Sequence, residues 1–578
     1  MNIKIAKEWK IKTEINDEQL QSFSQFHPVI ANLLIGRQIN TPEAAHIFFH
    51  SSYAHNAEDP FLFSKMEEAT VLVISCIKSA QPIVIYGDYD ADGVTSSSVL
   101  YETLKLLKAD VSIYIPDRVT EGYGMNIEAI KGLALKGTKL IITVDNGIRS
   151  KSEISFAQSL DLKVLLTDHH VPPAAEDTPD CLIINPMMPN EGYPYKFLAG
   201  VGVAAKLAVA IIRKTKLDLD LKNRLEDRIL DLVAIGTVAD CVRLTGENRI
   251  LVKKGLEIIN NHKRLGLREL IKVSKINSAR PVDAWNLGFQ IAPRLNAAGR
   301  VEHANAAFEL LTCSDELEAQ RLANSLNNNN LERQKITDEV VDYIDKNIVE
   351  SESLHKIIIA VNPEGAVWNE GVIGLVAGRI AERNHKPTLV ISGENNHYKG
   401  SGRSVENFNL IEALEACDKF LSKYGGHKAA CGFSINGKEN LEQFMLTLQE
   451  YCKNKIGGTL VGPTLVIDLA LKLVDIDENL INKINAFSPF GEGNPQPIFA
   501  SLKVELVDLN FMGQQNNHLK LKIRQDKSVV YSAIAFNATD KWPNLKIGAM
   551  IDLAYNLDIN EFNGRREVQL RIIDIKVL

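Results

Sequence analysis

The sequence predicts a multidomain α/β protein in which a parallel-sheet domain precedes a long helical connector, a smaller α/β domain and a C-terminal β-barrel. The length of 578 residues exceeds the roughly 250–300 residues at which a single core stops growing. Short apolar runs alternate with helical segments between residues 82 and 170, which indicates a doubly wound parallel sheet. After residue 460, six short strands follow one another, which is typical of a small barrel.

The composition is that of an ordinary globular protein. Hydrophobic residues make up 45% and charged residues 24%, which argues against a disordered, fibrous or membrane protein. The longest apolar stretch, 199–212, is broken by Lys206 and is shorter than the ~20 residues that span a bilayer. The first residues lack an apolar segment, so we expect no signal peptide. Seven cysteines without any CxxC pair fit a reducing cytoplasm and argue against a cysteine zinc site.

The net charge restricts how the protein could bind a polyanion. With 65 Lys and Arg against 72 Asp and Glu, the formal charge is −7. Proteins that bind nucleic acid through bulk charge are usually basic. Here phosphate would have to be bound by local groups of Arg and Lys or by metal ions.

The elements follow in order along the chain. Residues 1–50 show no strong strand signals and predict a small helical region. Apolar runs at 83–86, 111–115, 140–144 and 164–167 predict the strands of the sheet, with helices at 95–108 and 126–136 between them. Ligands bind at the carboxyl ends of such strands.

The second half of the chain is divided by composition. Residues 218–350 read as mostly helical, and 315–350 predict one long, packed connecting helix with apolar residues spaced by four. A second α/β region runs from 356 to about 455, and the barrel is of the oligonucleotide-binding (OB) type, although a sandwich has the same pattern. The predicted domains are 1–50, 51–315, 316–352, 353–458 and 459–578.

Acidic and histidine residues follow the predicted strands. Three aspartates alternate in GDYDADG, and further ones occur in TVDNG, LLTDHH and IGTVADCVRL, each expected at a strand end. The alternation in GDYDADG would place its carboxylates on one side of an extended turn. The candidate residues are Asp88, Asp90, Asp92, Asp145, Asp168, His169, His170 and Asp240.

Such a cluster predicts a metal site. Closely spaced carboxylates repel unless cations lie between them. Mixed Asp/His ligation favours Mn²⁺ or Mg²⁺ over a thiolate-bound zinc. A cluster this acidic would hold two ions about 3.5–4 Å apart, the spacing typical of hydrolytic phosphodiesterases.

The motifs YGDYDADGVTSS, VDNG, TDHH and VADCVRL resemble the four successive motifs of the DHH phosphoesterase superfamily. Within it, the chain is similar to the single-strand-specific exonucleases of bacteria. PDRVTEGYGMN, PRLNAAGR, WNEGVIGLVAGRIAER, SGRS, YGGHKAACGF and PFGEGNPQPIF also match, so the resemblance covers nearly the whole chain from about residue 50. The Gly-Gly-His segment at 425–427 resembles the accessory DHHA1 domain.

The resemblance implies a role for each metal ligand. Asp90 would bind one ion and Asp92 the other. Asp145 would bridge them, and His169 and Asp240 would complete the second site.

The resemblance also implies a departure from related pyrophosphatases. These place a histidine four residues before Asp90, where this chain has Tyr86, a poor ligand for a hard ion. Asp88 is the natural substitute. His170 would contact the scissile phosphate or stabilise the leaving oxygen, and Asp168 would orient one of the histidines.

Basic residues beside glycines are candidates for phosphate binding. The planar fork of Arg binds phosphate through two hydrogen bonds, and neighbouring glycines let backbone amides approach an anion. By contrast, Gly200-Val201-Gly202 lacks the GK[ST] ending of a phosphate loop, so we expect no ATP requirement. The candidate substrate-binding residues are Arg118, Arg294, Asn296, Arg300, Ser401, Arg403 and His427.

In the predicted barrel, Lys520, Lys522 and Arg524 alternate on one strand, and Phe511 could stack on a base. Ordinary solvent-facing strand residues would have the same pattern.

The predicted function is a metal-dependent exonuclease that degrades single-stranded DNA from its 5′ end to 5′-mononucleotides by a two-metal mechanism, in DNA repair and recombination. The polarity and the DNA preference are implied by the resemblance. One alternative is a DHH phosphodiesterase of short oligonucleotides or cyclic dinucleotides; another is a non-catalytic nucleic-acid-binding replication scaffold. The resemblance suggests a single-strand-binding protein and a recombination helicase as partners, and we expect a monomer.

Overall fold

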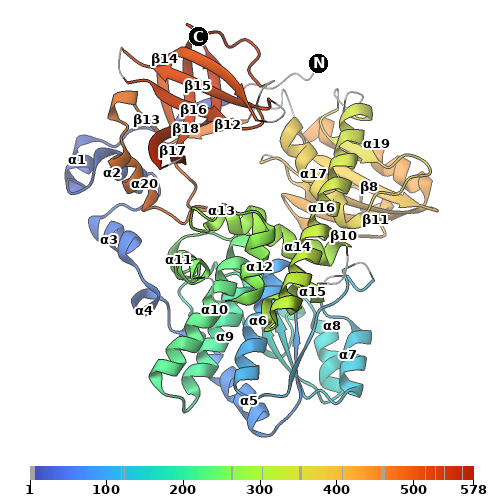
Figure 1. Ribbon diagram of the computed structural model, residues 1–578. Coiled ribbons are helices and arrows are strands. Elements are labelled where there is room, and N and C mark those ends of the chain that lie inside the picture. The colour runs from blue at the N-terminus through green and yellow to red at the C-terminus, as the bar shows by residue number, and fades with distance from the viewer. Residues whose placement is uncertain are drawn as a thin grey trace. The chain divides into compact units, whose positions relative to one another are not determined.

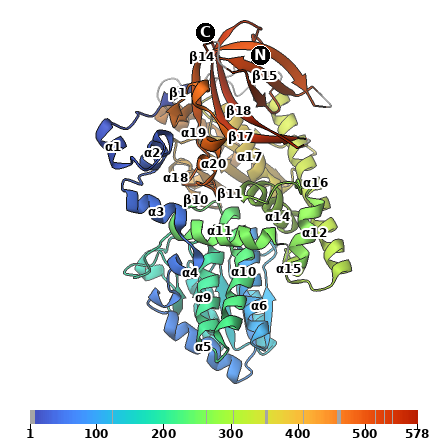
Figure 2. The same cartoon turned by 60° about the vertical axis from the view of Figure 1, so that its left-hand side comes forward.

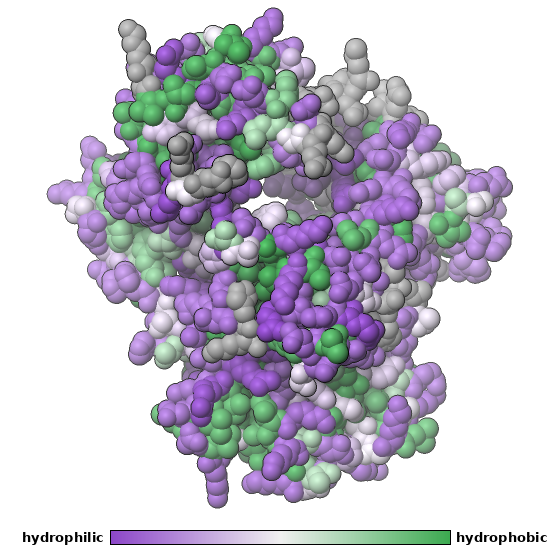
Figure 3. All heavy atoms as spheres, in the orientation of Figure 1, coloured by the Kyte–Doolittle hydropathy of each residue, from purple (hydrophilic) through white to green (hydrophobic). Residues whose placement is uncertain are grey.

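The computed structural model describes residues 7–578 except 119, 123, 262–263, 302–303, 350–354, 407, 457–462, 514–515, 527–528, 539–540 and 563. None of the helices in this described part is both long enough and apolar enough to span a membrane. The chain divides into two compact units, one formed by 59–240 and 255–462, the other by 1–58, 241–254 and 463–578. On the face that Figure 3 shows, hydrophobic residues are interspersed among hydrophilic ones, as on most protein surfaces.

The first unit begins with the predicted parallel sheet. In the described part of the chain this sheet has five strands in the order β3-β2-β4-β5-β6. The strands are β2 (Ile83–Tyr86), β3 (Val111–Tyr114), β4 (Leu140–Val144), β5 (Lys163–Thr167) and β6 (Leu182–Ile184). Every residue of β2 and β4 is buried, which is why they read as continuous apolar runs.

Helices cover both faces of this sheet. The sheet lies between α6 (Ala91–Leu106) and the pair α7 (Ile127–Leu135) and α8 (Lys151–Ser159) (Figure 1). On the α6 side, α9 (Gly200–Lys214) and α10 (Leu219–Ala239) run beside α6 (Figure 2). The flanking elements are η1 (Pro60–Leu62), α5 (Met66–Lys78) and η2 (Ala175–Asp177).

Tyr86, at the end of β2, belongs to the core of this sheet. Its side chain is fully buried among Val84, Ile141 and Leu166, and its hydroxyl donates a hydrogen bond to the carbonyl of Gly124. The ring is therefore used in packing.

A helical segment joins the two sheets of this unit. The predicted long connector is α16 (Glu316–Asn347), a continuous helix that begins at the N-cap Asp315, whose side chain accepts the amide of Glu318. Its apolar face, with Val340, Val341 and Ile344, is buried against the following domain. The preceding elements are α12 (Leu265–Val273), α13 (Ala284–Asn286), the π-helix η3 (Leu287–Ile291), α14 (Ala292–Val301) and α15 (Asn305–Thr312), while α11 (Gly246–Asn260) begins in the second unit and ends in this one.

The smaller α/β domain has a mixed sheet. Its described strands have the order β10-β11-β9-β8-β7, with only β7 and β8 parallel to each other. The strands are β7 (Ile358–Val361), β8 (Thr388–Glu394), β9 (His397–Arg403), β10 (Lys423–His427) and β11 (Ala430–Asn436). The helices are α17 (Glu370–Asn384), α18 (Leu410–Glu415), η5 (Asp418–Phe420) and α19 (Lys438–Lys455).

The second unit is built on the predicted barrel. Strands pair as β14-β15-β16-β18-β17, and β17 pairs again with β14, which closes the barrel in the manner of an OB-fold. The parallel pairing of β16 with β18 distinguishes this arrangement from an up-and-down meander. The strands are β12 (Thr464–Ile467), β13 (Leu469–Ala470), β14 (Phe499–Met512), β15 (His518–Arg524), β16 (Tyr531–Ala535), β17 (Met550–Phe562) and β18 (Arg565–Val577).

The N-terminal residues belong to the same unit. They form helices, as predicted, but begin with strand β1 (Glu8–Ile11), which pairs in parallel with β12 and carries no strong strand signal of its own. Phe23, Leu33 and Leu34 share one apolar core with barrel residues such as Phe499 and Leu553. The remaining helices are α1 (Asp17–Ser22), α2 (Pro28–Ile35), α3 (Pro42–His50), α4 (Tyr53–Asn56), η6 (Leu473–Asp475) and α20 (Glu478–Asn485).

Candidate metal centre and phosphate site

The three aspartates of GDYDADG lie where β2 turns into α6. The prediction that they alternate along an extended turn is wrong, because α6 begins at Ala91, four residues before the predicted start. Asp90 is the N-cap of this helix, and its Oδ1 accepts the amides of Asp92 and Gly93 at 2.9 and 3.0 Å. Asp88 precedes the helix, and Asp92 lies in its first turn.

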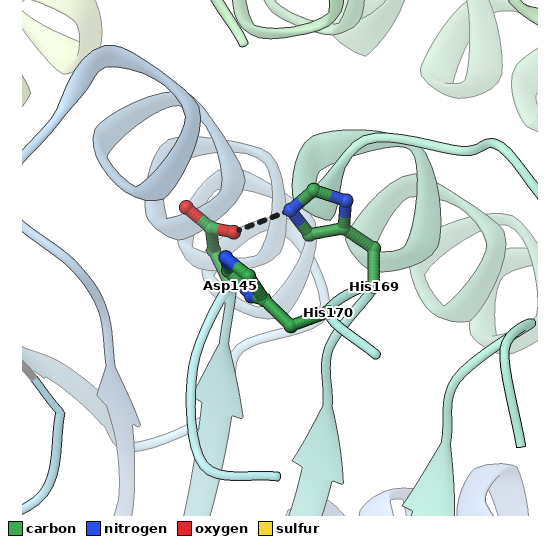
Figure 4. Close-up of side chains that lie close together, drawn as sticks. All are labelled: Asp145, His169 and His170. Atoms are coloured by element: carbon green, nitrogen blue, oxygen red, sulfur yellow. Dashed lines mark ion pairs between the residues drawn. The ribbon is translucent and has the colours of Figure 1, made fainter. Parts of the chain in front are cut away.

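Asp145 follows β4 directly and faces His169, which follows β5 (Figure 4). Nε2 of His169 lies 3.2 Å from Oδ1 of Asp145. The backbone of Asp145 has φ 61°, a left-handed conformation that few residues other than glycine adopt. Strain of this kind is concentrated at functional sites, where the surroundings enforce it.

His169 joins carboxylates from separate elements. Besides Asp145, its Nε2 lies 3.9 Å from Asp92 and 3.6 Å from Asp240. The prediction that Asp240 ends a strand is wrong, since it caps the C-terminus of α10. The apolar run before Asp240 is a buried helical segment, which periodicity alone does not distinguish from a buried strand.

Three groups of side chains offer ligand atoms within 4.8 Å of one another. One contains three carboxylates, and the other two combine carboxylates with imidazoles. The groups are Asp88, Asp90 and Asp145; Asp92, His169 and Asp240; and Asp145, His169 and His170. Asp145 of the first group lies 3.2 Å from His169 of the second, so these two groups define adjacent sites.

The mutual repulsion of the buried aspartates fits a site for cations. Burial and the charge of neighbouring carboxylates raise the pKa of Asp92 to about 7 and that of Asp240 to about 9. The same causes raise the pKa of Asp88 and Asp145 well above the usual range. Among the described residues, buried Oδ1 of Asp88 accepts no hydrogen bond. Divalent cations would remove this repulsion, and carboxylates with imidazole suit Mn²⁺ or Mg²⁺.

The imidazole of His169 is prepared for ligation. Burial and the positive charge of His170 lower the pKa of His169 to about 4, so its ring is neutral at physiological pH. Metal binding requires the neutral form.

Asp168 holds the second histidine. Its Oδ1 accepts the backbone amides of His169 and His170 and lies 2.7 Å from Nδ1 of His170, while Oδ2 accepts the amide of Ile148. Although burial alone would lower the pKa of His170, the hydrogen bond to Asp168 raises it to about 9. His170 is therefore a cation beside the acidic cluster.

The N-terminus of α9 holds Asp92, a contact that the sequence did not predict. The amides of Gly200 and Val201 donate to Oδ2 and Oδ1 of Asp92 at 2.7 and 2.8 Å. Gly200 also approaches Asp145 so closely that a Cβ would lie 2.7 Å from its side chain. In the sequence, this contact was marked by the Gly-Val-Gly segment, which does not match a phosphate loop. In the structure, the N-terminus of α9 binds an anionic side chain of the protein itself, that of Asp92.

Arginines gather beside the acidic cluster. The guanidinium of Arg118 lies over the ring of Tyr89, 4.9 Å from its centroid. Burial and the charges of Arg118 and Arg333 lower the pKa of Arg300 to about 9. Burial and Arg118 also lower the pKa of Arg403. Such mutual repulsion among arginines is relieved by an anion such as phosphate.

Ser401 and Arg403 lie on β9, against a helix face made of glycines. Nη1 of Arg403 donates to Oγ of Ser401 at 3.3 Å and to the carbonyl of Gly402 at 2.8 Å. A Cβ on Gly374 of α17 would come within 3.3 Å of both side chains. His427 lies at the same level two strands away, because Ala430 pairs with both His427 and Arg403.

The PRLNAAGR segment contacts the metal cluster and the smaller domain. Oδ1 of Asn296 accepts the amide of Ala91 at 2.6 Å, and Nη1 of Arg300 donates to the carbonyl of Gly371 at 2.6 Å. Arg294 instead donates to Asn327 and to the carbonyl of Gln290. The structure therefore brings Asn296 and Arg300 to the site, whereas Arg294 is used in helix packing.

Arg333 of α16 is a further candidate that the sequence did not predict. Its Nε is buried and makes no hydrogen bond to any residue that the structure describes, and its charge affects Arg300. No glycine flanks Arg333, and its neighbours in LERQK are those of an ordinary solvated helix.

Three family models match successive parts of the chain. The N-terminal domain of the DHH family matches residues 82–237, the DHHA1 domain matches 354–454, and the RecJ OB domain matches 467–574. These matches fall on the parallel sheet, the mixed sheet and the barrel.

Curated relatives are similar over most of the chain. The single-stranded-DNA-specific exonuclease RecJ of Bacillus subtilis is 39% identical, over 98% of this chain and 71% of the relative. The protein of the same name from Escherichia coli is 33% identical, over 89% of this chain and 90% of the relative.

Solved structures of RecJ proteins are also similar to this chain. The crystal structure of RecJ in complex with Mn²⁺ from Thermus thermophilus has a TM-score of 0.83 and 26% identity, over 100% of this chain and 80% of that chain. A structure of exonuclease RecJ bound to manganese has 32% identity and a TM-score of 0.60, over 69% of this chain and 98% of that chain.

Proposed function

Because the chain belongs to the RecJ family of single-stranded-DNA-specific exonucleases, we infer that it hydrolyses single-stranded DNA from the 5′ end to 5′-mononucleotides in DNA repair and recombination. The observation that carries this proposal is the juxtaposition of the acidic cluster with the cationic group of Arg118, Arg300 and Arg403. One part suits divalent cations, and the other suits a phosphate anion.

The cofactor is a pair of divalent ions, Mn²⁺ or Mg²⁺, as in the metal-bound structures of relatives. We assign Asp88 and Asp90 to one ion, and Asp92, His169 and Asp240 to the other, with Asp145 shared. When bound, two such ions supply an activated water and stabilise the leaving oxygen.

The protein's own groups would orient the substrate. His170, held as a cation by Asp168, would donate a hydrogen bond to the scissile phosphate or to the leaving 3′ oxygen. The amides at the start of α9 donate to both carboxylate oxygens of Asp92 and would fix its orientation.

The cationic group would bind the 5′-terminal phosphate. A terminal monoester carries more charge than an internal diester, so a site that requires it senses a strand end. We assign this role to Arg403, with Ser401 and His427 on the same sheet and Arg118 opposite. Anchoring the terminal phosphate would present the first internal diester to the metal centre and release one nucleotide per cut.

We also propose partners and a location, which the family resemblance suggests. A single-strand-binding protein coats the substrate, and a recombination helicase generates it, so we propose both as partners of a monomeric enzyme. The buried thiols of Cys76, Cys417, Cys431 and Cys452 are free, which supports a cytoplasmic location, where the DNA of a bacterium lies.

The match to the RecJ OB domain favours long strands over the alternative substrates, short oligonucleotides and cyclic dinucleotides. The test is to incubate the protein and Mn²⁺ with a long 5′-phosphorylated single strand, the matching duplex and a cyclic dinucleotide. We expect mononucleotides from the single strand alone. Preferential cleavage of the cyclic dinucleotide would favour the alternative, and no cleavage of any substrate would favour a scaffold.

A further inference from the structure

We infer that Trp285 and Phe289 form a stacking platform for unpaired bases of the single strand, on the helix that leads to the metal centre. This inference rests on the proposed function and names a substrate contact that the metal centre and the phosphate site do not supply. The two residues are one helical turn apart, in α13 and η3.

The two rings are exposed to solvent and stack on each other. Trp285 is 55% and Phe289 67% exposed, although large aromatic residues are usually well buried. Their ring planes are inclined by only 26°, with centroids 5.4 Å apart, so the rings stack on each other. The pair presents an extended π surface without a partner among the described aromatic residues, and such surfaces stack on bases of any sequence.

The helix beneath the rings connects them to the site. α13, η3 and α14 follow without a break, and in the π turn the amide of Ala292 donates to the carbonyl of Leu287. Turns of this kind shift the phase of a helix and are frequent at functional sites. Asn296, which accepts the amide of Ala91 in the acidic loop, lies seven residues after Phe289, or roughly 10 Å along the helix axis. A few nucleotides of single strand bridge such a distance.

The charge of this part of the sequence favours a polyanion as the occupant. Residues 271–300 contain five basic residues and one acidic residue, in a chain of net charge −7. The acidic residue, Asp283, accepts the amide of Asn286 as a helix cap. Arg294 donates to the carbonyl of Gln290, the residue that follows Phe289 in the sequence. Aromatic rings next to cationic groups are the combination by which proteins bind single strands without sequence preference.

The test compares Trp285→Ala and Phe289→Ala with Leu135→Ala, which removes a 90% exposed apolar side chain at the end of α7. Substrates are 5′-phosphorylated strands of about four and about 16 nucleotides, the limits of single-strand site sizes. We expect each platform variant to raise KM for the long strand by roughly 5- to 150-fold, the equivalent of ~1–3 kcal/mol for a stacked base. In both platform variants, kcat/KM for the short strand should stay unchanged. In Leu135→Ala, KM for the long strand and kcat/KM for the short strand should both stay unchanged.

A second measurement identifies the bases as the ligand. Long strands that lack one base at a time should show, with the wild-type protein, a KM penalty at one or two positions, and this penalty should disappear in Trp285→Ala. In chelator, where hydrolysis stops, the long strand should also quench a part of the tryptophan fluorescence that Trp285→Phe lacks.

Unchanged KM values in both platform variants, with an abasic penalty that persists in Trp285→Ala, would overturn the platform while leaving the exonuclease intact. A wild-type protein that does not hydrolyse the long strand at all would instead refute the proposed function.

Discussion

Nε2 of His169 lies 3.2 Å from Oδ1 of Asp145, although 24 positions separate the two residues in the sequence. They meet because β4 and β5 are neighbouring parallel strands whose carboxyl ends share one edge of the sheet. This contact joins the two adjacent ligand groups, so changes at Asp145 test both.

Asp145→Asn should stabilise the metal-free protein. The substitution removes one of several buried like charges, and asparagine tolerates the left-handed backbone better than most residues. Because one pKa unit corresponds to about 1.4 kcal/mol, the gain should be on the order of 1 kcal/mol or more. Thermal unfolding in chelator measures it, with the exposed Asp177→Asn as control. A lower Tm for Asp145→Asn would mean that the carboxylates do not repel one another in the folded protein.

Metal binding should stabilise the protein more strongly at higher pH. The pKa values of Asp92 and Asp240 are raised in the folded state, to about 7 and about 9. Their contribution to stability is therefore lost as the pH rises from below their unfolded values through 9, where both carboxylates become charged. Bound Mn²⁺ neutralises the negative charge of these two carboxylates and so offsets the loss of stability. The difference in Tm between Mn²⁺ and chelator should grow from about pH 6 to about pH 9; an equal difference at both would contradict the assignment.

Arg403→Ala should impair the hydrolysis of 5′-phosphorylated strands more than that of 5′-hydroxyl strands. A lost charge-assisted hydrogen bond is worth roughly 1.5–3 kcal/mol, or about 10- to 150-fold in kcat/KM. The measurement compares kcat/KM for two strands that differ only at the 5′ end. Arg383→Ala, which removes an exposed guanidinium paired with Asp345, is the control. An equal loss on both strands would move end recognition to Arg118 or Arg300, since Arg294 is bonded within the helices.

Lys520→Ala and Lys522→Ala should weaken binding of long strands and leave kcat on short strands unchanged. Both residues lie on β15 of the barrel, outside the unit with the metal cluster. For each DNA phosphate that a lysine neutralises in the wild-type protein, its removal should decrease the slope of log K against log salt by about 0.7. Lys438→Ala in α19 is the control, and an unchanged slope in both barrel variants would exclude these lysines from DNA binding.

Point substitutions test the barrel better than a truncation does. The apolar side chains of Phe23, Leu33 and Leu34 are buried against barrel residues. Deletion of the barrel would expose them to water, and a loss of activity would then reflect unfolding.

Much of the site could be predicted from the sequence because the strands are short and buried. In an all-buried strand such as β4, the apolar run ends where the polar ligands begin, so Asp145 and His169 were recognisable by position. The position of Asp240 could not be recognised in this way, because a buried helical turn and a buried strand have the same apolar run. The early start of α6 was hidden because its first turn is made of Ala91, Asp92 and Gly93, which also suit a turn.

Contacts between residues far apart in the sequence could not be predicted from sequence patterns. β1 has four residues and exists because it pairs with β12, more than 450 positions away. Arg333 and Trp285 lie in ordinary-looking helical segments. Only the folded chain shows that Arg333 has a buried Nε and Trp285 an exposed ring.

The release of nucleotides from a 5′-labelled long single strand, at saturating Mn²⁺, tests the central claim most directly when the wild-type protein is compared with Asp145→Asn. We predict that the wild-type protein releases the label as a 5′-mononucleotide from the first time point, and that the variant, although folded, is slower by several orders of magnitude. A variant that keeps more than about a tenth of the wild-type rate would contradict the shared-ligand assignment, since tenfold is only ~1.4 kcal/mol in barrier. Label released from the wild-type protein in longer fragments would contradict exonucleolytic cleavage from the 5′ end.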